Sequence, residues 1–83
     1  MAPQALSLLN GPLALAAARA LAGRVEREAG ASPKAQINRA FQLTLQRAPT
    51  ADERRACAAF LAQHGLVAFC RSMLNLNEFI YLD

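Results

Sequence analysis

The chemically most suggestive pair in this 83-residue chain is Cys57 and His64, because a thiol activated by an imidazole is a common catalytic nucleophile. Both residues fall on one predicted helix, seven positions apart. The helical rise separates them by about 10 Å, whereas a thiol and its base must approach to about 3 Å. The spacing therefore predicts no Cys–His nucleophile, and His64 is expected to be an exposed residue that stabilises a helix end.

Metal and haem sites are also disfavoured. The sequence holds two cysteines and one histidine, with no CxxC pair and no CxxCH haem-attachment motif, which leaves a zinc site short of a ligand. No metal and no cofactor are expected. Cys57 and Cys70 lie on either side of Gly65 and could face each other, but a disulfide needs Cα atoms about 4.4–6.8 Å apart. Two free thiols are the favoured state, with the disulfide as the alternative.

Charge and hydropathy exclude two further classes of protein. The net charge is +3 with a pI near 9.5, but the basic residues are dispersed and no aromatic side chains alternate with them. Nucleic-acid binding is therefore not expected. The chain contains no uninterrupted apolar run of about 18 residues, so no membrane span is expected either.

Proline, glycine and capping residues divide the chain into helices. Pro3–Leu9 could form a short first helix, Pro12 opens a second that ends at Gly30, and Ser32-Pro33 caps a third that ends near Arg47. A fourth helix follows Thr50 and ends at Gly65, and a fifth starts at Leu66 and either continues or restarts through Asn75 to Tyr81. The short linkers predict an all-α fold, a compact bundle of four to five short helices packed antiparallel or orthogonally.

Each predicted helix carries an apolar stripe that should face the core. On the helix over 13–29 the stripe is Leu13, Ala14, Ala17, Leu21 and Val25, and on the helix over 33–47 it is Ile37, Ala40, Phe41, Thr44 and Leu45. On the last two helices it is Ala56, Cys57, Phe60, Leu61 and His64, then Leu66, Phe69, Cys70, Met73 and Leu74.

The segment from Arg47 to Glu53 has the pattern of a helix stop followed by a capped helix start. Pro49 cannot continue the preceding helix. Thr50 and Glu53 have the spacing of a capping box, in which each side chain accepts a hydrogen bond from the other residue's backbone amide.

Glu78 places a carboxylate within the otherwise apolar tail, residues 74–83. We expect Glu78 to meet Arg47, because an unpaired carboxylate among apolar side chains is costly. Two alternatives stay open: Asn75-x-x-Glu78 forms a local capping box, or Glu78 is solvated. Phe79 is expected to help cover the body of the domain.

Three motifs in order carry a family resemblance: Pro3-Gln4-Ala5-Leu6-x-Leu8-Leu9-Asn10, then Ile37-x-x-Ala40-Phe41 with Arg47-x-Pro49-Thr50-x-x-Glu53, and then Leu74-Asn75-Leu76-Asn77-Glu78-Phe79-Ile80-Tyr81. Together they resemble the C-terminal helical region of a large planctomycete-type family of uncharacterised exported proteins, often with upstream cytochrome c-like domains. The resemblance implies an extracytoplasmic parent protein and no catalytic residues. It also implies that residues 1–83 are a single helical domain cut from the C-terminal part of that parent.

The sequence thus predicts a non-catalytic structural or protein-interaction module, not an enzyme. Its structural residues are Arg47, Pro49, Thr50, Glu53, Asn75, Glu78 and Phe79. One alternative is an accessory part of an extracytoplasmic enzyme or redox protein, in which Arg47, His64 or Glu78 would contribute to an active site formed mostly by other domains. The other is a weak nucleic-acid-binding module. The expected partner of the structural module is the remainder of the parent or another protein, and Leu6, Leu8, Leu9 and Leu13 form an apolar patch that could drive homo-oligomerisation.

Overall fold

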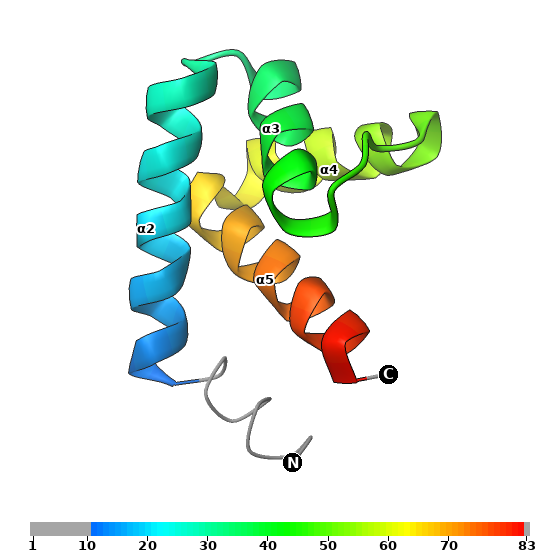
Figure 1. Cartoon of the computed structure of the whole chain (residues 1–83). Coiled ribbons are helices and arrows are strands. Elements are labelled where there is room, and N and C mark those ends of the chain that lie inside the picture. Colours follow the sequence, from blue (N-terminus) through cyan, green and yellow to red (C-terminus); the bar gives the residue numbers. More distant parts are fainter. Residues whose placement is uncertain (1–10, 83) are drawn as a thin grey trace.

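The computed structural model describes the backbone of residues 11–82 and the side chains of residues 11–76. Over this part of the chain it contains four α-helices and no strand (Figure 1): α2 is Pro12–Ala29, α3 is Pro33–Leu45, α4 is Ala51–His64 and α5 is Leu66–Leu82. The all-α prediction is confirmed. The helix predicted over Pro3–Leu9 lies outside the described residues.

The helices begin and end at the residues that the local chemistry predicts. The Ser32 hydroxyl caps α3 by accepting from the Ala35 amide at 3.3 Å. Gly30 and Gly65 end α2 and α4 with φ of 79° and 90°, a backbone region that strongly favours glycine. Gln46 takes the left-handed conformation after α3, and its amide donates to the Phe41 carbonyl at 3.0 Å.

The corner between α2 and α3 has a further tie that the sequence pattern did not reveal. Gln36 is buried, and its side-chain amide donates to the Gly30 carbonyl at 2.7 Å, so a polar group inside the fold is satisfied. On the surface of the same corner, Glu28 accepts from Arg24 at 2.9 Å and from Arg39 at 2.6 Å. These exposed pairs add little stability, because solvent screens them.

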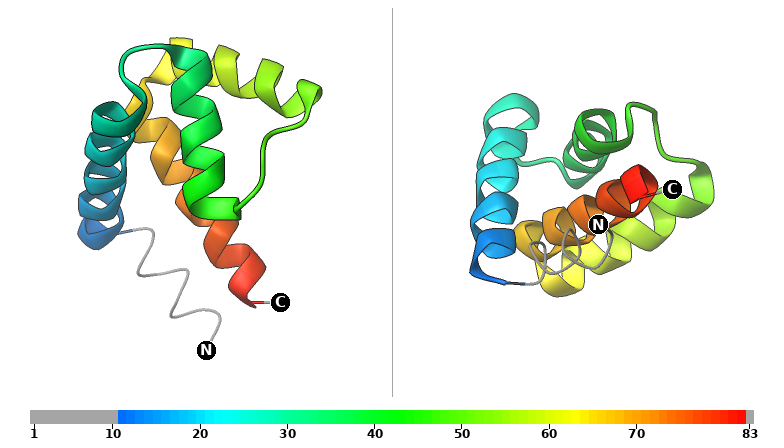
Figure 2. Two further views of the ribbon diagram at one scale, coloured as in Figure 1. Left: turned by 45° about the horizontal axis from the view of Figure 1, so that its top comes forward. Right: turned by 60° about the horizontal axis from the view of Figure 1, so that its bottom comes forward.

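Helix α5 is the central element of the bundle. It contacts α2, α3 and α4, and α2 also contacts α3 (Figures 1 and 2). The core contains buried apolar side chains from all four helices: Ala18, Ala22, Val25, Ile37, Ala40, Phe41, Leu61, Phe69, Cys70 and Met73.

The predicted stripes on α3 and α5 are confirmed, and the stripe on α2 is confirmed in part, since Ala14 and Val25 are buried and Leu21 packs against the core. The buried residues of α2 are Ala14, Ala18, Ala22 and Val25, whereas Leu13 is 62% exposed. The three alanines are spaced four residues apart, so they form one ridge along the helix. Their small side chains allow neighbouring helices to approach closely, and Leu21 is partly buried against the same core.

The stripe on α4 is also narrower than predicted. Leu61 is buried, Cys57 and Phe60 are half-buried, and Ala56 and His64 are exposed. The reason is that α4 packs against α3 and α5 from one side only, which leaves part of its apolar face uncovered. None of the helices in the described part of the chain is long and apolar enough to cross a bilayer.

Candidate functional site

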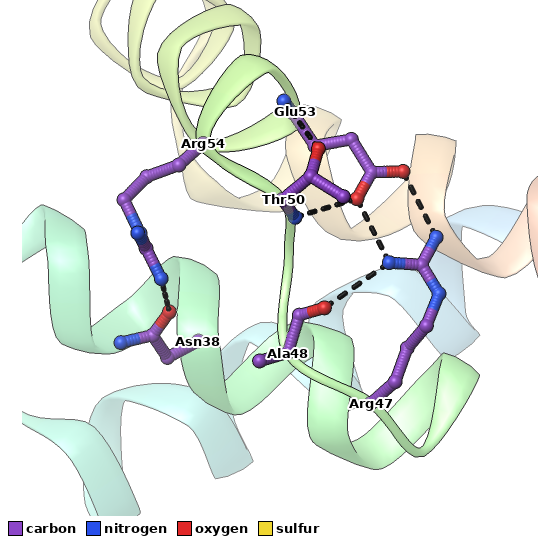
Figure 3. Close-up of polar contacts among 6 residues, drawn as sticks. All are labelled: Asn38, Arg47, Ala48, Thr50, Glu53 and Arg54. Atoms are coloured by element: carbon purple, nitrogen blue, oxygen red, sulfur yellow. Dashed lines mark hydrogen bonds and ion pairs between the residues drawn. The ribbon is translucent and has the colours of Figure 1, made fainter.

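The turn between α3 and α4 is held by a two-pronged ion pair. Arg47 Nη1 donates to Glu53 Oε1 at 2.8 Å, and Nη2 donates to Oε2 at 2.9 Å (Figure 3). This parallel geometry is the strong form of an arginine–carboxylate contact. Arg47 also donates to the Ala48 carbonyl at 3.1 Å, so one side chain spans the turn from the end of α3 to the start of α4.

The predicted capping box is confirmed on the same carboxylate. The Thr50 hydroxyl accepts from the Glu53 amide at 3.1 Å, and Glu53 Oε1 accepts from the Thr50 amide at 2.9 Å. Pro49 between them is buried. The Glu53 carboxylate therefore accepts hydrogen bonds both within the helix cap and from Arg47. We call Arg47, Pro49, Thr50 and Glu53 the α3–α4 clasp.

The clasp is fixed to the core and to α3 at two more points. The Arg47 guanidinium carbon lies 5.5 Å from the ring centre of the buried Phe41, within the range of a cation–π contact. Arg54, one residue after Glu53, donates to Asn38 Oδ1 on α3 at 3.1 Å (Figure 3). The two helices are thus joined by side chains on either side of the turn.

The clasp predicts a loss of stability in acid. Hydrogen bonds from Arg47, and then from the Thr50 amide, lower the pKa of Glu53 from its ordinary value of 4.5 to about 2. A lowered folded-state pKa means that this contribution is complete above pH 4.5 and is lost as the pH falls towards 2. We expect the stability deficit of Glu53→Gln at neutral pH to shrink over this range in urea unfolding experiments.

The matched control for this titration is Asp52→Asn, one residue earlier in the same helical turn. The Asp52 carboxylate pairs with the exposed Arg55 and does not touch the clasp. The Asp52→Asn variant should therefore lose stability in acid as the unchanged chain does, because Glu53 and its partners are intact. A deficit of Glu53→Gln that stays constant from neutral pH to about pH 2 would count against the role given to the Arg47–Glu53 pair.

Of the predictions made for the tail residues, the structure tests the one for Asn75 but not those for Glu78 and Phe79. Asn75 lies inside α5, which continues without a break from Leu66 to Leu82, so a helix start and capping box at Asn75 is wrong. The side chains of Glu78 and Phe79 lie outside the described residues, and the Arg47–Glu78 contact stays a prediction. The pairing of Arg47 with Glu53 was missed, although a carboxylate in a capping box has a second oxygen free for a cation across the turn.

The uncovered face of α4 lines an apolar groove. Two adjoining hollows of about 290 and 200 Å³ share Ala56, Cys57, Met73 and Leu76. The larger extends to Phe41, Leu45 and the Arg47–Glu53 pair, and the smaller to Phe60, Phe69 and Ser72. We call this surface the α4–α5 groove. Leu76, which belongs to the predicted apolar tail, lies on the rim of the groove and is 51% exposed.

Neither cysteine has the character of a nucleophile. Both are free thiols; Cys70 is buried in the core and Cys57 lines the groove. Burial raises the pKa of Cys57 and raises that of Cys70 to about 11, so both are protonated at neutral pH. His64 is exposed, as predicted, and its ring packs against Phe60 with centroids 4.6 Å apart.

Among the described residues, no three His, Cys, Asp or Glu side chains are grouped so that they could hold a metal ion. The charged residues that line a hollow of about 500 Å³ between α2 and α3 are Glu28 and Arg39, which pair with each other. The geometry of the described residues therefore offers a helical corner held by side chains and an apolar groove.

Comparison with known protein families gives one match. Residues 1–61 match the family model described as PSD1, a protein of unknown function (DUF1553). The chain belongs to this family. No curated protein and no solved structure matches the chain.

The PSD1 match ends at Leu61, inside α4, and it includes the whole α3–α4 clasp. Helix α5 lies beyond the matched residues, yet it supplies Phe69, Cys70 and Met73 to the core. The folded unit of this PSD1 protein thus extends past the part that the family model recognises.

Proposed function

We propose that this chain is a non-catalytic packing module, which joins other polypeptide through the α4–α5 groove. The observation that carries the proposal is the groove itself. It is lined by apolar side chains from α3, α4 and α5, and the two charges at its end, Arg47 and Glu53, satisfy each other. Such a surface favours an apolar protein segment over a polar substrate.

The clasp supports a structural role over an accessory catalytic one. A side chain that contributes to an active site needs hydrogen-bond donors available to a substrate. Arg47 instead donates from both terminal nitrogens to Glu53, and its guanidinium lies over the Phe41 ring. The clasp instead fixes the angle between α3 and α4, and this angle shapes one end of the groove.

The wider setting of the module is part of the same proposal. The three sequence motifs support placing it in the C-terminal part of a longer, extracytoplasmic parent of the planctomycete type. The partner in the groove is then the remainder of that parent or a second protein. Self-association through exposed leucines such as Leu13 is a further outcome of the same surface chemistry.

The proposal is tested with a fluorescent amphipathic peptide that carries leucines at positions i, i+3, i+4 and i+7. We expect saturable binding, measured by fluorescence anisotropy, and a Kd at least about tenfold higher for Leu76→Asp, because a buried leucine contributes about 1.5–3 kcal/mol. Leu13→Asp is the control, since Leu13 is also exposed but does not line the groove. No binding, or equal losses in both variants, would overturn the proposal.

A further inference from the structure

We draw no further inference here: the strongest candidate, the α4–α5 groove with Cys57, Met73 and Leu76 along both of its hollows, belongs to the site already described, and nothing in the described part of the chain shows which polypeptide covers it.

Discussion

Phe69→Ala should lower the free energy of unfolding by about 3–5 kcal/mol, the usual cost of removing a buried phenylalanine ring. Phe69 is 2% exposed and lies on α5, the helix that contacts the three others described. A domain of this size has a total stability of about 4–12 kcal/mol, so this one substitution should remove at least about a quarter of it. Urea denaturation followed by circular dichroism measures the change.

The matched control is Leu76→Ala on the same helix. Leu76 is 51% exposed, so its truncation should cost well under half as much as that of Phe69. Because α5 lies beyond the residues that match the family model, the comparison also tests the extent of the folded unit. Similar small costs for both variants would mean that α2, α3 and α4 fold without α5, contrary to the packing described above.

Features set by neighbouring residues were predicted well from the sequence. The capping box at Thr50 and Glu53, the Ser32 cap and the stops at Gly30 and Gly65 all depend on contacts within a few residues. The stripe on α3 was also predicted correctly, because its large side chains leave little choice of face.

Features set by packing partners were predicted poorly. On α2 the expected stripe included Leu13, which is exposed, and did not include Ala18 and Ala22, which are buried on the alanine ridge. The α4–α5 groove had no signature either, because it results from what α3 and α5 leave uncovered on α4. Arg47 pairs with Glu53 because the turn around Pro49 brings the two side chains together. Sequence spacing alone did not predict this pair.

These two groups of features explain why the fold was easier to predict than the candidate site. The fold follows from where helices start and stop, and short linkers then restrict how they pack. The candidate site is a surface between helices, so its position depends on which side of each helix is buried. An error of one ridge on α2 leaves the fold class intact but changes which apolar side chains stay exposed.

Ala18→Leu should destabilise the domain by about 1–3 kcal/mol, although leucine has a favourable helix propensity and a more apolar side chain. Ala18 is fully buried on the ridge that faces α5, between Ala14 and Ala22 on the preceding and following turns. The extra carbon atoms would have to push α2 away from α5 or adopt a strained rotamer. Urea denaturation measures the cost against that of Ala20→Leu, which lies on the exposed side of the same helix.

The comparison of these two alanines isolates packing from every other effect of the substitution. Helix propensity and the change in side-chain size are the same at both positions, so only the surroundings differ. Ala20→Leu should therefore change the free energy of unfolding by less than about 0.5 kcal/mol. If Ala18→Leu were neutral or stabilising, α2 and α5 would not be in close contact at this ridge, and the leucine face expected from the sequence would again be the better assignment.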